Sequence, residues 1–215
     1  DANLSQESRG LVITEILKQA EYSNNLFKLE SLNILNGLGQ DEINAEIDSL
    51  TNNDPDGELP RMEKLKEVLP GLVAETISIL KMHKRMVNNS FYDDINMGAE
   101  HFVVSVFQTF IQRYPTDEEL YNGKEMLKPR NAILFLQSGS GKEDFINIFF
   151  ESDAYFMGQT NILFIRYLFR NPTSEESVNY SLDYRKTKNM TDKQQIKEYK
   201  ELQKRILSTD EFIGL

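Results

Sequence analysis

Phe107–Glu119 reads FQTFIQRYPTDEE and Phe164–Glu176 reads FIRYLFRNPTSEE, so one pattern of aromatic, arginine, proline, threonine and glutamate residues recurs at an offset of 57. A second pair of stretches follows in the same order. Phe150–Phe156 (FESDAYF) matches Ile206–Phe212 (ILSTDEF) at an offset of 56. Agreement at both ends of a unit predicts an internal repeat.

Each part of this pattern has a structural interpretation. The aromatic and aliphatic residues before the arginine predict the buried face of a helix. Proline disfavours the α conformation in the residue before it, so the helix should end there. A threonine followed three residues later by glutamate predicts a capping box at the start of the next helix. The pattern-bearing residues are Arg113, Pro115, Thr116 and Glu119 in one copy, and Arg170, Pro172, Thr173 and Glu176 in the other.

The two arginines allow two interpretations. A cation is favoured at a helix C-terminus, where it can donate to free carbonyl groups. Arginine is also a common ligand-binding residue, but the same helix end in both copies favours the structural role. In the closing stretches, Ser152 and Ser208 should begin a short turn that folds Phe156 and Phe212 back onto the core. The inner faces of the helices before the two arginines should be buried, and these faces carry Phe107, Phe110, Phe164 and Tyr167.

The order of these motifs resembles a numbered bacterial domain of unknown function that occurs in secreted and surface proteins and is distantly similar to the phycobilisome linker domain. The resemblance covers about 102–215 as two copies. A glycine-containing stretch typical of that family is present as Ser138–Lys142 in the first copy, whereas the second copy has the charged stretch Arg185–Lys197 instead. The resemblance implies helical repeats that serve extracytoplasmic scaffolding or recognition, without catalysis.

Apolar residues recur at helical spacing along the rest of the chain, and no stretch alternates long enough to predict a strand. The predicted helical segments are 11–20, 26–35, 43–50, 61–87 with a bend near Pro70, and 102–111. Polar loops should lie at 51–60 and 88–94. We therefore expect an all-α, multi-helix protein with an internal two-helix repeat in its C-terminal half. Its predicted regions are 1–95 and 96–215, the latter containing repeats at about 102–158 and 159–215.

Composition excludes several classes of protein. The formal net charge of −10 argues against a nucleic-acid-binding surface and against an electrostatic attraction to anionic lipid. No apolar run reaches the length of a membrane span. The chain has no cysteine, which excludes disulfides, thiolate metal sites and cysteine nucleophiles. The chain starts at Asp1, and its polar opening Asp1–Gly10 suits a tether after a removed signal peptide or lipoprotein leader, or a truncated start. We expect an extracytoplasmic location.

One loop follows the spacing of a calcium-binding EF-hand. Asn52, Asp54 and Asp56 take positions 1, 3 and 5, glycine takes position 6, and Glu63 takes position 12. Position 1 is asparagine instead of aspartate, and Pro60 at position 9 offers no side-chain ligand. A solvated acidic turn is the competing interpretation. Calcium is the single cofactor that the sequence suggests.

No other motif predicts chemistry. Ser138–Lys142 lacks the residues of a phosphate-binding loop and should link two helices. His83 and His101 show no ligand spacing, and a solvated or half-buried histidine is the expected state. Acidic pairs such as Asp93–Asp94 could serve glycoside hydrolysis, but the pairs at 118–119 and 175–176 are explained by helix first turns. The stretch 186–204 should be the solvated face of a long helix, with a partner-binding helix as the alternative.

We therefore expect no catalytic residues and a non-enzymatic bacterial binding or scaffold module, whose partner is a protein or a cell-surface component. The alternative is a calcium-dependent regulatory or adhesive module that uses the loop at 52–63. A hydrolase built from scattered carboxylates ranks third.

Overall fold

Helical periodicity and helix caps determine most of the architecture. The computed structural model describes residues 5–55 and 57–214. It is 71% helical, which confirms the predicted all-α, multi-helix fold class. Among the described residues, no helix is both long and apolar enough to cross a membrane.

The first half of the chain forms short helices, and the C-caps of some of them are asparagines, namely Asn53, Asn88 and Asn96. Their bounds are α1 Gln6–Ile16, α2 Ala20–Ile34, α3 Gln40–Asn52, α4 Leu59–Lys66, α5 Val68–Val73, α6 Ile79–Val87 and α7 Ser90–Ile95. In place of one helix with a bend near Pro70, the predicted segment 61–87 is divided into the three helices α4, α5 and α6. Helix α7 lies where the sequence predicted a loop, and Asn89 caps it by accepting a hydrogen bond from the backbone N–H of Tyr92.

The second half contains longer helices and one small hairpin. Its elements are α8 Ala99–Ile111, α9 Asp117–Leu127, β1 Ala132–Leu134, β2 Gln137–Gly139, α10 Lys142–Phe150, α11 Asp153–Leu168, α12 Ser174–Arg185, α13 Asp192–Leu207 and the 3-10 helix η1 Glu211–Ile213. Where the sequence predicted a two-helix unit, α8–α9 and α11–α12 each continue into a third helix. Helix α11 also crosses the repeat boundary expected between 158 and 159.

The hairpin corrects the expectation of no strand and the expectation that Ser138–Lys142 only links two helices. The antiparallel strands β1 and β2 pair Ala132 with Gly139 and Leu134 with Gln137, so part of the expected interhelical linker is a strand. Phe135 and Leu136 form the tip, both with positive φ, and Leu136 is fully exposed. Three-residue strands are too short to show a period in the sequence.

One continuous apolar core connects the two predicted regions. It includes Leu26 and Met82 from the first half and Phe107, Phe149 and Ile206 from the second. Helices α8 and α11 cross closely, because Gly158 lies against the backbone of α8 and any Cβ there would collide with the carbonyl oxygen of Phe110. Phe107, Phe110 and Phe164 are buried as predicted, whereas Tyr167 is half-buried.

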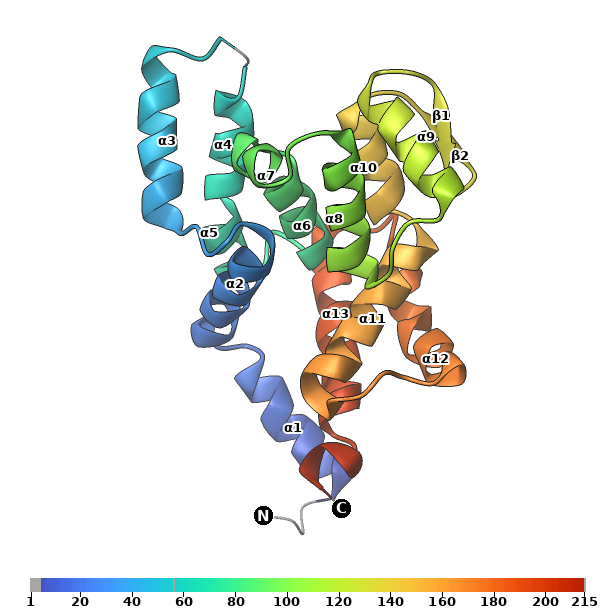
Figure 1. Ribbon diagram of the computed structural model, residues 1–215. Helices are drawn as coiled ribbons and strands as arrows, with labels where there is room; N and C mark the ends of the chain where they lie inside the picture. The colour runs from blue at the N-terminus through green and yellow to red at the C-terminus, as the bar shows by residue number, and fades with distance from the viewer. Residues whose placement is uncertain (1–4, 56, 215) are drawn as a thin grey trace.

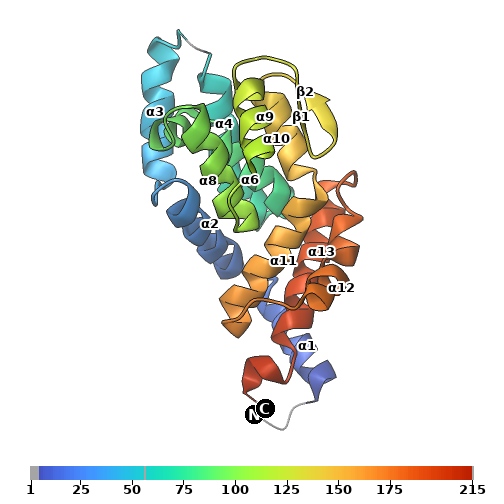
Figure 2. The same cartoon turned by 45° about the vertical axis from the view of Figure 1, so that its right-hand side comes forward.

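The helices form an elongated bundle (Figures 1 and 2). Helix α6 lies in the middle, with α4 on one side and α10 on the other. Helices α11, α12 and α13 form the lower part, and α1 runs along α13 to the bottom, where it meets η1. The apolar pattern of the predicted segment 11–20 is buried only in part, because Leu17 is buried whereas Leu11 and Ile16 are more than half exposed.

Candidate ligand-binding pocket

The repeat residues predicted from the sequence form two capping networks with the same local geometry. Thr116 and Thr173 each accept a hydrogen bond of 3.2 Å from the backbone N–H of the glutamate three residues on. That glutamate accepts one of 2.8 Å from the threonine N–H, which completes the predicted capping box. Arg113 binds Glu119 through two nitrogens, and Arg170 binds Glu176 in the same way.

These networks also correct the predicted helix ends. Helices α8 and α11 end at Gln112 and Phe169, which adopt the left-handed conformation, so neither helix extends to the proline. The arginines donate to the loop carbonyls of Tyr114 and Asn171 instead of the free carbonyls of the helix. A left-handed C-cap satisfies helix ends through backbone geometry, which the sequence does not show when the residue is not glycine.

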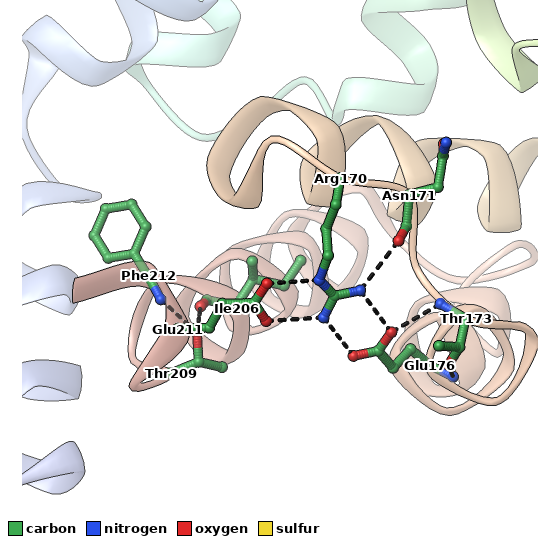
Figure 3. Close-up of polar contacts among 8 residues, drawn as sticks. All are labelled: Arg170, Asn171, Thr173, Glu176, Ile206, Thr209, Glu211 and Phe212. Atoms are coloured by element: carbon green, nitrogen blue, oxygen red, sulfur yellow. Dashed lines mark hydrogen bonds and ion pairs between the residues drawn. The ribbon is translucent and has the colours of Figure 1, made fainter. Parts of the chain in front are cut away.

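The second network extends to the C-terminal end of the described chain (Figure 3). Arg170 also donates to both carboxylate oxygens of Glu211, at 2.6 and 2.8 Å, and so connects the loop after α11 with η1. Ser208 ends α13 instead of starting a turn like Ser152, which caps α11. Phe212 is 42% exposed, so the expectation that it folds onto the core like Phe156 is wrong. These contacts stabilise loops.

The EF-hand-like loop is arranged around the start of α4. The carboxylate of Asp54 accepts hydrogen bonds from the backbone N–H groups of Glu58 and Leu59, at 2.6 and 3.0 Å. Asn52 donates back to the carbonyl of Asp48, and Glu63 lies exposed within α4. Asp56 lies outside the described residues. Among those described, no group of three or more histidine and acidic residues could hold a metal ion.

A pocket of about 400 Å³ lies between α1, α13 and the loop before α6. Leu17 and Ile196 form its apolar wall, together with the aliphatic stems of lysines. Those lysines are Lys18 from α1's C-terminal end and Lys193, Lys197, Lys200 and Lys204 from α13. The spacing of the latter four places them on one face of the helix. The stretch 186–204 is therefore more than a solvated face, because its lysines line a cavity.

The lysines around this pocket differ in their partners. Lys200 binds Glu75 at 2.5 Å, and Lys204 approaches Glu201 at 3.4 Å. Lys197 reaches a carboxylate only at 4.0 Å, the limit of an ion pair. Lys193 has no carboxylate within that limit in residues 5–55 and 57–214. The pocket therefore presents cationic groups that are incompletely neutralised, in a chain whose net charge is −10.

Two contacts hold α1 against α13 and so define the pocket. Arg9 donates to the carbonyl oxygen of Ser208, at 3.1 Å, and binds Asp210. Gly10 lies beside Lys204, where an added Cβ would come within 3.2 Å of the lysine Cε. The missing side chain lets α1 pack closely on α13. The helices run antiparallel, which places Thr14 and Leu17 opposite the first half of α13.

A polar network that is largely buried lies outside the lining of the pocket. Tyr22 donates to the side-chain oxygen of Gln203 at 2.6 Å, and the amide of Gln203 donates to the hydroxyl of Tyr167 at 2.9 Å. Arg166, which precedes Tyr167 in the sequence, donates to the carboxylate of Glu30 at 2.8 Å. The Nε2 atom of His83 lies 3.5 Å from Glu30, and its Nδ1 lies 2.8 Å from the hydroxyl of Tyr155. The network joins α2, α6, α11 and α13.

Burial and charge together determine the protonation of this network. Burial alone would raise the pKa of Glu30, but His83 and Arg166 outweigh it and lower that pKa to about 2. Burial raises the pKa of the Tyr22 hydroxyl well above its usual value. Glu30, His83 and Tyr155 are 8%, 1% and 0% exposed, so bulk solvent and substrates do not reach them. Their arrangement connects helices.

Sequence reasoning did not find these residues. His83 was expected to be solvated or half-buried and is fully buried, whereas His101 is exposed as expected. Glu30, the partner of His83, lies 53 positions away from it in the sequence, so no local spacing connects the two residues. One available signal was the position of His83 between Met82 and Met86, on the apolar face of α6. The lysines of α13 recur at helical spacing in the sequence. The sequence did not show that α1 packs beside them and adds an apolar wall.

No protein-family model matches the sequence, and no curated protein and no solved structure matches it significantly. The assignment of a ligand therefore depends on the geometry of this chain.

Proposed function

We propose that the protein is a non-enzymatic binding module, and that the pocket between α1 and α13 takes an amphipathic anion with an apolar chain and one acidic head. The observation that carries this proposal is the combination of the apolar wall at Leu17 and Ile196 with the lysine face of α13. A pocket of about 400 Å³ falls in the size range of small-molecule sites, which are mostly apolar with a few polar groups.

The two parts of such a ligand match different parts of the pocket. Burial of an apolar chain against Leu17, Ile196 and the lysine stems is favourable by roughly 25 cal/mol per Å². The acidic head would lie near Lys193 and Lys197, the two lysines with the weakest carboxylate contacts. Amphipathic lysines suit this role because their stems are apolar and their ammonium groups stay hydrated.

Binding is favoured over catalysis by the groups that line the pocket. They are lysine, glutamate, glutamine, threonine, leucine and isoleucine, without histidine or serine. The hydroxyl of Thr14 donates its proton to the carbonyl of Gly10 at 2.7 Å, whereas an activated nucleophile would donate to a base. The buried Glu30, His83 and Tyr155 do not line the pocket.

An extracytoplasmic bacterial location is part of the same proposal. The resemblance of 102–215 to a helical domain of secreted and surface proteins supports it. A scaffold role, in which the protein contacts another protein or a cell-surface component, would use exposed apolar residues of α1 outside the pocket, such as Leu11 and Ile16.

Calorimetric titration with dodecanoate tests the ligand class. We expect saturable binding below the critical micelle concentration and no binding of dodecyltrimethylammonium, which has the same chain with a cationic head. Lys197→Gln should weaken binding several-fold, and Thr14→Phe should prevent it by filling the pocket. Lys128→Gln, a matched charge change at the C-cap after α9, should leave it unchanged. Equal binding of both detergents, or none of either, would contradict the proposal.

A further inference from the structure

A second cavity lies on the opposite flank of α6 from the core and is lined mainly by cations. Its volume is about 300 Å³, and α4 and α10 pack on either side of α6 to form its walls. Arg61 and Lys64 belong to α4, and Lys81, Lys84 and Arg85 belong to α6. Glu143 is the one acidic residue of the lining. Five cations around one cavity contrast with the acidic net charge of the chain.

This concentration follows from the pattern of α6. Ile79, Met82, His83 and Met86 are buried, so Lys81, Lys84 and Arg85 must share the remaining face. Burial of the apolar face orients the three cations together, and α4 adds two more from a neighbouring helix. Asn88 and Asn147 contribute amide groups to the same lining.

Carboxylates also contact these cations. Glu67 binds Arg85 at 3.0 Å, Glu151 binds Lys84 at 2.7 Å, and Asp192 binds Lys81 at 3.0 Å. None of these three acids lines the cavity. Glu67 and Glu151 have side chains that are 63% and 40% exposed, so solvent screens their pairs and a bound anion can compete with them.

Two cations have unused capacity. Lys64 has no carboxylate within ion-pair distance in the part of the chain that the structure describes. Arg61 binds Glu58 at 2.6 Å through one terminal nitrogen, while its Nε atom is buried without a hydrogen-bond partner. The ammonium group of Lys64 is therefore available to an anion in the cavity, and Arg61 adds positive charge to the same wall.

We infer that this cavity binds a small ligand with two adjacent phosphoryl groups. Arginine forks match phosphate oxygens in a bidentate manner, lysine adds point charge, and the two amides can donate to further oxygens. The five cationic side chains from two helices carry more positive charge than one carboxylate would neutralise. They therefore suit a ligand with several negative charges. The site is separate from the pocket between α1 and α13, because no residue lines both.

Titration of the full chain with inorganic pyrophosphate tests this inference. At low ionic strength we expect saturable binding with a dissociation constant below about 1 mM. The affinity should fall as salt is added, because the contacts are charged. Arg85→Gln and Lys64→Ala should each weaken binding about tenfold, the effect of one charge-assisted hydrogen bond. Lys64→Ala is the safer variant for folding, since Lys64 supports no ion pair within the described chain.

Matched controls decide between this site and general charge attraction. Lys128→Ala removes one exposed lysine at the C-cap of α9, outside the cavity, and should leave pyrophosphate affinity unchanged. Equal weakening by Lys64→Ala and Lys128→Ala would overturn the inference. Binding of a sulfated disaccharide or of citrate in place of pyrophosphate would also overturn it, as would no saturable binding of pyrophosphate to the folded wild-type chain.

Discussion

The carboxylate of Glu30 accepts a hydrogen bond of 2.8 Å from Arg166, which lies 136 positions later in the chain. The contact joins α2 to α11 and therefore connects the two halves of the molecule. Glu30 is 8% exposed, and a buried carboxylate is stable only when it is paired. The contact explains why one core spans both predicted regions.

The pKa of Glu30 leads to a prediction of acid sensitivity. Its folded-state pKa of about 2 lies below the ordinary 4.5, so its contribution to stability is fully present above about pH 5 and is lost as pH falls towards 2. The loss should reach up to about 3 kcal/mol. In Glu30→Gln, which can still accept from Arg166, the wild-type advantage in urea unfolding at pH 7 should shrink by pH 3. Glu63→Gln, an exposed substitution on α4, serves as the control.

The capping boxes predict equal effects in the two copies. Thr116→Ala and Thr173→Ala should each lower the free energy of unfolding by about 1 kcal/mol, because each removes the acceptor for a helix N–H. Ser174→Ala, one position after the second cap, should change it by less than about 0.5 kcal/mol. Denaturant midpoints measure all three. An unchanged midpoint in either threonine variant would show that its cap contributes nothing.

Two phenylalanines provide a test of the core. Phe107 is 0% exposed and packs on Phe149 with ring centroids 5.2 Å apart, so Phe107→Ala should destabilise the protein by about 3–5 kcal/mol. Phe169 is 90% exposed at a left-handed helix end, so Phe169→Ala should change stability by about 0.5 kcal/mol or less. Chemical denaturation measures both, and similar losses in the two variants would contradict this assignment of faces.

The loop at 52–63 should respond to Asp54 and not to calcium. Asp54→Ala removes the acceptor for two N–H groups at the start of α4 and should cost about 1 kcal/mol. Calcium at millimolar concentration should leave the melting temperature unchanged, because both oxygens of Asp54 already accept backbone hydrogen bonds. A calcium-dependent rise that disappears in Glu63→Gln would instead establish the EF-hand hypothesis.

Features that depend on residues close together in the chain could be predicted from the sequence. The capping boxes at Thr116 and Thr173 depend on contacts three residues apart, and the burial of Phe107 and Phe110 follows from one helical period. The helical class follows for the same reason. Propensity, capping and periodicity are local, so one stretch of chain determines them.

Features that depend on which helix covers which face required the tertiary structure. Leu11 and Leu17 share one apolar pattern, yet Leu17 is buried against α13 and Leu11 is exposed. The pairing of Glu30 with Arg166, the pocket along the lysines of α13 and the cation-lined cavity beside α6 all join residues far apart in the sequence. A pattern shows that a face can be buried, and only the packing of the whole chain decides which face is covered, because burial is a property of contacts between helices.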